Sequence, residues 1–248
     1  MNKKISIICP THKRKTLQTR FATKVLENCS DVKKCEIVFG IDDNDEIALD
    51  TAEELKKKYG EEQIRICLIK PNENIANIIN ICANTTCRGE ILGTAADDVL
   101  FEAKGWDLTV IEEFSKYPDG ILLLWSDDGL WGGQLASHYF IHKNWVKALG
   151  NVQPTFFHAD WTDHWNQTLA TNLKRGKLIK DRSKLFLRHL HAEHGGMEKD
   201  ETYWKMKARR ERNVIEGLTF HKPTEEMKVA FKKQLEKLKK FIEDYNEK

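Results

Sequence analysis

The chain has 248 residues, of which 40% are hydrophobic and 31% are charged, and its formal net charge at neutral pH is only +2. This composition predicts a globular protein with one large domain and a substantial core, and the near balance of charges does not by itself indicate a nucleic-acid-binding protein. No apolar run reaches the roughly 18 residues of a membrane-spanning helix, and the apolar stretch before Pro10 is too short for a signal peptide, so we expect no membrane partner.

The six cysteines all lie within the first 87 residues, and no two of them form a CxxC pair. Several fall inside predicted strands and helices, where a thiol behaves as a small apolar side chain. This distribution predicts a reducing, cytoplasmic compartment and no zinc cluster.

The first 125 residues alternate between apolar strands rich in branched side chains and helical patterns. The strands are predicted at 5–9, 36–41, 64–69, 90–94 and 121–125, and the helices at about 15–29, 47–59, 75–86 and 105–117. Nearly unbroken apolar strands that alternate with helices are typical of an α/β fold, in which helices cover both faces of a mostly parallel sheet.

The second half of the chain is less regular. A strand is predicted at 138–142, a helix at 160–176, a strand that runs into a histidine-rich loop at 184–196, and two helices at about 200–216 and 224–246. Asp160 is the expected N-cap of the helix at 160–176, and Gly176 is its expected stop.

Three predicted strands end in polar motifs, which are CPTHKR at 9–14, IDDND at 41–45 and AADD at 95–98. Ligands of parallel sheets bind beyond the carboxyl ends of the strands. The segment from Thr11 to Arg14 is either a structural loop or a contact for an anionic ligand near a helix N-terminus. Asp42 and Asp43 either form a turn or contact a base or ribose.

Asp97 and Asp98 are neighbouring carboxylates between apolar residues. Because like charges repel, such a pair needs a cation, a basic partner or solvation. Mg2+ and Mn2+ prefer oxygen ligands and keep waters or phosphates in their coordination shell. The pair therefore indicates either a divalent metal site that also receives a diphosphate, or a solvated turn.

The order ISIICPTHKR, IVFGIDDND, RGEILGTAADDVLF resembles family 2-like glycosyltransferases with the GT-A fold, over about the first 105 residues. The resemblance implies a GT-A-like (Rossmann-like) catalytic domain at 1–198, with a nucleotide half over about 1–100 and an acceptor half over about 101–198. Residues 199–248 would then form a helical, basic C-terminal extension.

The resemblance also assigns roles to the motif residues. Pro10, Thr11 and either Asp42 or Asp43 would contact the nucleoside of a nucleotide-diphosphate-sugar donor. Asp97, with Asp98 as a second ligand, would hold the Mn2+ or Mg2+ ion that bridges the diphosphate.

The sequence departs from the family pattern at two places. Ala95 replaces the first acid of the D-x-D-D motif, which removes a ribose contact. An Arg-Asn pair that the family often has before the GE strand is also missing. The diphosphate therefore needs another cation, for which Arg14 and Arg88 are the candidates.

Residues 156–166, FFHADWTDHWN, contain two carboxylates, which share a face if they lie on one helix. In one interpretation both are structural, one as the helix cap and the other as a first-turn acid that interacts favourably with the helix dipole. In the other interpretation one of them is functional. The resemblance implies a general base in this part of the chain for enzymes that invert the sugar. Asp163 is the first choice and Asp160 the second, because Asp160 stands at the expected cap, and His158 is expected to orient the site.

The stretch RHLHAEHGG holds His189, His191 and His194. Two residues apart on a strand, His189 and His191 share a face. The resemblance implies that a C-terminal histidine completes the metal shell, and His191 is the first choice and His189 the alternate. Four tryptophans are expected to be either core residues or sugar-stacking platforms, namely Trp125, Trp131, Trp161 and Trp165.

The leading hypothesis is a metal-dependent hexosyl- or pentosyltransferase whose acceptor is a glycan, a small molecule or a hydroxylated DNA base. The basic segment 205–212 is either a solvated surface or a phosphate contact. The alternatives are a nucleotidyltransferase, a non-catalytic GT-A-like nucleotide-binding module and a metal-dependent nuclease. The first of these needs a glycine-rich loop after the first strand, and CPTHKR contains no glycine.

Overall fold

A computed structural model describes residues 4–71, 73–158 and 160–247. Its centre is a seven-stranded sheet with the order β3-β2-β1-β4-β7-β6-β8. The strands are β1 (Ile5–Pro10), β2 (Cys35–Asp42), β3 (Ile64–Ile69), β4 (Ile91–Thr94), β6 (Leu123–Ser126), β7 (Tyr139–His142) and β8 (Gly176–Ile179). β7 runs antiparallel to β4 and β6, and the other pairings in this sheet are parallel. The predicted α/β class with a mostly parallel sheet is confirmed.

The apolar runs form strands because both faces of the sheet are covered. Along β1, Ile5 and Ile7 enter one core cluster and Ile8 enters the other, so apolar residues stand on both faces of this strand. On the first face lie α1 (Lys15–Glu27), α2 (Glu46–Tyr59) and α4 (Trp106–Ser115). On the second face lie α3 (Ile75–Thr85), α5 (Lys143–Leu149), α6 (Thr162–Asn172) and α8 (Glu225–Asn246).

A second, two-stranded sheet joins distant parts of the chain. β5 (Val99–Phe101) pairs antiparallel with β9 (Leu187–His189), so that Val99 lies opposite His189. This pairing brings the AADD motif next to the histidine-rich loop, which contains the short 3-10 helix η2 (Ala192–His194).

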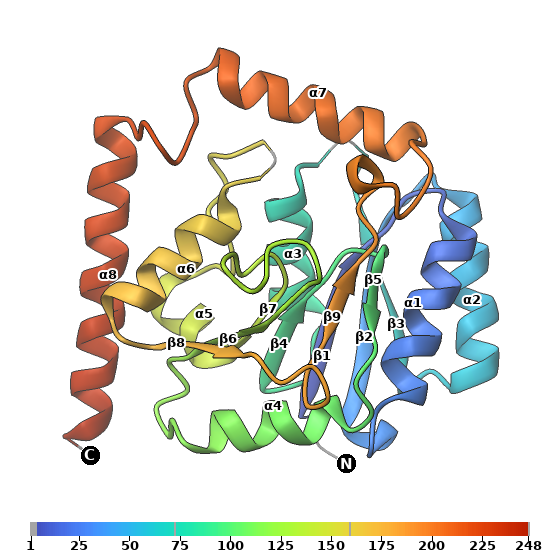
Figure 1. The fold of residues 1–248 in the computed structure, drawn as a ribbon, viewed down its shortest axis with the longest axis horizontal. Coiled ribbons are helices and arrows are strands. Elements are labelled where there is room, and N and C mark those ends of the chain that lie inside the picture. The colour runs from blue at the N-terminus through green and yellow to red at the C-terminus, as the bar shows by residue number, and fades with distance from the viewer. Residues whose placement is uncertain (1–3, 72, 159, 248) are drawn as a thin grey trace.

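The C-terminal segment has two helices with different surroundings. α7 (Glu201–Ile215), drawn in orange at the top of Figure 1, lies across the carboxyl ends of the central strands. α8 lies beside α5 and α6 and buries Met227 and Leu238 in the second core cluster. No helix among the described residues combines the length and apolar character that crossing a membrane requires.

Helix α6 begins and ends differently from the prediction. Its N-cap is Trp161, not Asp160, and both residues have a positive φ, 63° and 46°. The chain leaves the helix at Lys174, which also has a positive φ of 56°, so Gly176 does not stop the helix and instead begins β8. α5, β5 and β8 are short elements that the periodicity did not indicate.

Arg88 lies at the amino-terminal edge of the sheet, immediately before β4. Its Nε is 2.8 Å from Glu36 Oε2, and its Nη1 is 2.9 Å from Glu62 Oε2. Glu36 is fully buried and also accepts a 2.6 Å hydrogen bond from Ser6 Oγ. The suggestion that Arg88 contacts a diphosphate is therefore corrected, because its guanidinium neutralises a core carboxylate at the opposite edge from Asp97.

We expect Arg88→Ala to lower the free energy of unfolding by about 3 kcal/mol, because the buried Glu36 carboxylate would lose its charged partner. Urea denaturation measures the change. Lys58→Ala is the matched control, since Lys58 and Glu27 are both more than half exposed and such a pair contributes little to stability. Equal stability of the two variants would contradict the structural role of Arg88.

Candidate active site

Asp97 is buried at the carboxyl end of β4 and has two donors from the loop after β1. Thr11 Oγ1 donates to its Oδ2 at 2.7 Å, and Arg14 Nη1 donates to its Oδ1 at 3.0 Å. Only 2% of Asp97 is exposed, and burial raises its pKa to about 6 against the opposing charge of Arg14. Both of its carboxylate oxygens are thus occupied by side chains of the Thr11–Arg14 loop.

Asp98 is buried beside Asp97 but faces imidazoles instead of a guanidinium. Its Oδ1 lies 3.4 Å from His189 Nε2, and the ring of His138 lies 4.8 Å from that of His189. Burial by itself would raise the pKa of Asp98, but the neighbouring His189 and His138 hold it below its ordinary value. His189 is fixed in place because its backbone N–H donates to Asp128 O at 2.9 Å.

Three buried polar atoms in this cluster have no hydrogen-bond partner within the described parts of the chain: Asp98 Oδ1, His189 Nδ1 and His138 Nε2. Buried polar atoms are normally paired, so an unpaired carboxylate oxygen among imidazoles needs an explanation. Carboxylate oxygen and neutral imidazole nitrogen are ligands of divalent transition ions such as Mn2+. Asp98 and His189 are therefore a donor pair suited to the divalent cation that the sequence indicates, with His138 nearby and Asp98 as the better ligand than Asp97.

His189 is better placed than His191 to be the histidine ligand. The Nδ1 of His191 accepts the N–H of Glu193 at 3.2 Å, where it caps η2, and only its Nε2 remains available. His189 instead approaches Asp98 directly. The geometry thus favours His189, the alternate of the sequence analysis, as the histidine beside Asp98.

His138 is a site residue that the sequence reasoning missed. Burial lowers its pKa to about 3, so its imidazole is neutral near pH 7 and has a nitrogen lone pair available. The sequence offered one signal for this residue, a histidine at the start of the predicted apolar strand 138–142. In the structure that strand lies next to β4, which leads into the AADD motif.

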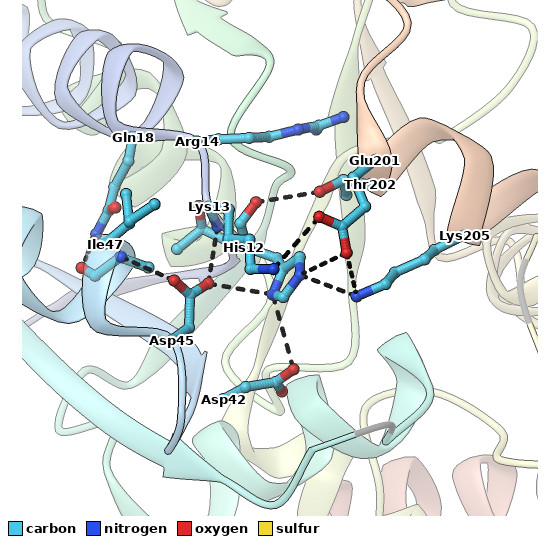
Figure 2. Close-up of polar contacts among 12 residues, drawn as sticks. His12, Lys13, Arg14, Gln18, Asp42, Asp45, Ile47, Glu201, Thr202 and Lys205 are labelled. Atoms are coloured by element: carbon cyan, nitrogen blue, oxygen red, sulfur yellow. Dashed lines mark hydrogen bonds and ion pairs between the residues drawn. The ribbon is translucent and has the colours of Figure 1, made fainter.

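Asp42, one of the predicted nucleoside contacts, lies in a polar cluster around His12, as Figure 2 shows. His12 Nδ1 is 3.1 Å from Asp45 Oδ2 and 3.8 Å from Asp42 Oδ2. Asp42 is partly buried, and burial raises its pKa, whereas Asp43 is exposed on the turn. Of the two predicted nucleoside contacts, Asp42 is the one that faces the His12 cluster, just beyond Pro10 and Thr11 on the neighbouring strand end.

Asp45 is a second residue that the sequence reasoning did not single out. It is buried, caps α2 by accepting the N–H of Ala48 at 3.0 Å, and accepts the N–H of Lys13 at 2.7 Å. These contacts fix the loop after β1 against the end of β2, and so hold His12 in place (Figure 2).

Helix α7 is attached to the β1 loop at its N-terminal end. Asp200, its N-cap, accepts hydrogen bonds from Arg14 Nε at 2.6 Å and Nη2 at 2.7 Å. Thr202 Oγ1 donates to His12 O at 3.1 Å, and Lys205 Nζ lies 3.0 Å from His12 Nε2 (Figure 2). Arg14 thus links Asp97 to the first residue of the helix.

Further along α7, other side chains contact the remaining rim of the site. Arg209 Nη2 donates to Glu73 O at 2.8 Å, and Arg210 Nε lies 2.8 Å from Asp160 Oδ2. The N–H of His158 donates to Asn213 Oδ1 at 2.8 Å. The helix therefore covers the carboxyl edge of the sheet from the nucleoside half to the segment that holds Asp160.

Asp160 and Asp163 do not share a helix face, since Asp160 lies outside α6. Asp163 Oδ1 accepts the N–H of His164 at 2.8 Å and lies 3.0 Å from the Nδ1 of the same histidine. Asp160 is held by Arg210, whose Nη1 also lies 3.8 Å from Glu193 Oε1, beside His191. The structure thus connects Asp160, and not Asp163, to the histidine cluster.

Cys29, Cys35 and Asp107 form a separate group at the other end of the molecule, with ligand atoms within 4.8 Å of one another. The cysteine spacing did not indicate this group. Asp107 accepts the N–H groups of Ser30 at 2.7 Å and Asp31 at 3.2 Å, so its carboxylate secures the chain after α1.

No protein-family model and no curated protein matches the sequence of this chain. Solved structures do match its shape. The mannosyltransferase PcManGT from Pyrobaculum calidifontis, in complex with GDP-Man and Mn2+, gives a TM-score of 0.60 at 12% identity over 97% of this chain and 70% of its own. TarS 1–349 from S. aureus gives 0.58 at 13% identity over 75% of this chain and 60% of its own.

The chain has the GT-A fold. TarS 1–349 in complex with UDP-GlcNAc matches in the same way, with a TM-score of 0.58 at 14% identity over 82% of this chain and 64% of that one. The chain spans less than two thirds of these TarS chains. At such identities the likeness defines the fold, whereas the activity depends on the side chains at the site.

We expect Asp200→Asn to loosen α7 without unfolding the protein. Asparagine still caps the helix, but the charge-assisted pair with Arg14 is lost. Amide hydrogen exchange over 201–215 should become about tenfold faster while the global stability changes little. Asp31→Asn, at the exposed cap of a 3-10 helix, is the control. Unchanged exchange in α7 would show that the Arg14 pair does not hold it.

Proposed function

We propose that this protein is a divalent-metal-dependent glycosyltransferase that moves a hexosyl or pentosyl group from a nucleotide-diphosphate donor to an acceptor hydroxyl, with inversion. The strongest support is the buried Asp98 near the carboxyl end of β4, whose Oδ1 makes a long 3.4 Å contact with His189 Nε2 and, within the described parts of the chain, no hydrogen bond of good geometry. The GT-A fold around it is shared with structures that contain GDP-Man and Mn2+ or UDP-GlcNAc.

Each half of the site would have a separate task. Pro10, Thr11 and Asp42 would bind the nucleoside, and Asp98 with His189 and His138 would hold Mn2+ or Mg2+. When bound, such an ion neutralises the charge of the leaving diphosphate. Arg14 is the cation nearest to Asp97 and would turn from Asp97 toward the phosphates.

The acceptor hydroxyl needs a base, because a neutral hydroxyl is a poor nucleophile near pH 7. The sequence ranked Asp163 first because Asp160 was expected to cap the helix, but Trp161 takes that position. Asp160 also has a strained positive φ, and such strain often occurs at functional positions. We therefore assign the base to Asp160, which Arg210 holds beside Glu193 and the histidine cluster.

A DNA acceptor is the weaker alternative. Several basic side chains of the segment 205–212 are engaged within the protein, because Lys205 contacts Glu201, Arg210 contacts Asp160 and Arg212 contacts Glu216. Non-specific nucleic-acid binding depends on cations that are available to phosphates. A glycan or a small hydroxylated molecule is therefore the preferred acceptor.

The metal assignment is tested by the thermal stability of the protein with UDP or GDP, with and without Mn2+. A ligand at 100 times its Kd stabilises the native state by about 2.7 kcal/mol. In the wild type, Mn2+ should add to the stabilisation by the preferred nucleotide, and in Asp98→Asn this addition should vanish. Asp244→Asn, near the exposed end of α8, is the control. An Asp98→Asn variant that keeps the full Mn2+ effect would refute the site.

The base assignment is tested with two isosteric variants. Asp160→Asn should keep donor and metal binding but lose about 10²–10⁴ in the rate of transfer, since the amide cannot accept the proton. Asp163→Asn should keep most of its turnover. Donor affinity and turnover are measured for both, and the reverse result would return the role of base to Asp163.

A further inference from the structure

A continuous row of five rings leads from the buried carboxylate of Asp98 to the surface. The successive ring centroids are 4.8, 5.1, 5.5 and 6.3 Å apart, in the order His138, His189, His191, His194 and Trp131. The first ring is buried, whereas Trp131 is 50% exposed. We call this row the ring wall. Successive rings are strongly tilted or edge-to-face, with interplanar angles of 79°, 85°, 60° and 86°, so they line one side of the proposed site and end in an indole open to solvent.

Hydrogen bonds hold the loop that carries the exposed Trp131 in place. The buried Asp128 accepts the N–H groups of Leu130 at 2.9 Å and Trp131 at 2.8 Å, and its other oxygen accepts the hydroxyl of Ser137 at 2.7 Å. The carbonyl of Asp128 also accepts the N–H of His189. A single buried residue thus fixes both the backbone of Trp131 and the strand that carries His189.

The other tryptophans that the sequence pointed out have different environments. Trp125 and Trp165 are buried, and their indole N–H groups donate to Gly133 O and Gln234 Oε1. Trp161 is partly buried against His164 and His221. Of these four, Trp131 alone is more than one third exposed, and it is also the one that belongs to the ring wall.

We propose that Trp131 is the stacking platform for a neutral carbohydrate acceptor, a role that rests on the glycosyl transfer proposed above. The C–H face of a pyranose ring is flat and apolar, and a rigid indole covers it at little cost in conformational entropy. The acceptor hydroxyl would then point along the ring wall toward the buried end of the site. Trp131 is thus a substrate-binding residue that selects the class of acceptor.

The charges beside Trp131 favour a neutral sugar over a nucleic acid. Arg182 lies 2.6 Å from Asp127 on the same loop, so its charge is already paired. Glu193, next to His194, adds a partly exposed carboxylate to this rim. The Arg182–Asp127 pair thus contributes no net charge that would attract a polyanion, whereas both carboxylates can accept hydrogen bonds from the hydroxyl groups of a neutral sugar.

The indole N–H resonances of 15N-labelled protein provide the test, and Trp131→Phe identifies the signal of Trp131 by its loss. The probes are methyl glycosides of glucose, galactose, mannose and N-acetylglucosamine, and a single-stranded oligodeoxynucleotide. At least one glycoside should shift the Trp131 signal saturably, with a Kd in the millimolar range. Trp204 is the matched internal control, because it is 52% exposed on α7 and its signal should not move.

Affinity in two variants separates stacking from a general effect. Trp131→Ala should weaken glycoside binding about tenfold or more, while Trp204→Ala should leave it unchanged. Because Trp131→Ala has no Trp131 indole signal, binding is measured through the saturation-transfer signal of the sugar. Trp131→Phe should keep most of the affinity, because a phenyl ring still stacks. Equal losses in the two alanine variants would overturn the proposal.

Three further results would also overturn it. The first is the absence of a saturable shift with any glycoside up to about 50 mM, which is far above the expected Kd. The second is an equal shift of the Trp131 and Trp204 signals. The third is a shift of the Trp131 signal with the oligonucleotide but with none of the glycosides. The last result would favour a nucleic-acid acceptor. Glycoside binding is measured without nucleotide or metal, so it is independent of the Mn2+-dependent nucleotide test. Failure of that test would refute the proposed metal site and leave the carbohydrate subsite standing.

Discussion

Arg14 holds two carboxylates at once, and much of the arrangement at the carboxyl edge depends on it. One end of its guanidinium neutralises the buried Asp97, and the rest binds both oxygens of Asp200. The first contact belongs to the central sheet and the second to the cap of α7. Without Arg14, a buried carboxylate would lack a counter-charge and the covering helix would lose its strongest attachment.

Two adjacent aspartates are stabilised here by different means, which explains how the AADD motif tolerates burial. Asp97 receives a hydroxyl and a guanidinium from the loop after β1, whereas Asp98 faces imidazoles from β9 and from the start of β7. Both residues lie in the turn between β4 and β5, and their carboxylates meet different neighbours there.

The sequence predicted the first half of the fold well, because continuous apolar strands and clear helical periods leave few alternatives. The strand at 64–69 coincides with β3, and the carboxyl-end motifs do meet at one edge. The prediction was less successful where tertiary contacts decide. Trp161 caps α6 with a positive φ, which no local preference of tryptophan indicates.

The role of Arg88 and the place of His138 also depend on long-range contacts. An arginine is a residue type that often contacts phosphate, but the partners of Arg88 come from β2 and from the segment before β3. His138 becomes a neighbour of His189 only because the β6–β7 loop lies against β9. The sequence pointed to carboxylates and histidines, whereas only the chain topology decides which of these residues lie together.

The pairing of β5 with β9 determines when the site can exist during folding and synthesis. Val99 pairs with a residue far along the chain, so Asp98 lacks His189 until β9 has been made and docked. Closing so long a loop is slow compared with forming the local βα units that precede β4. A nascent or truncated chain that ends before β9 therefore cannot form the Asp98–His189 pair, and one that ends before Asp200 also lacks the contacts of Asp200 with Arg14 and of Arg210 with Asp160.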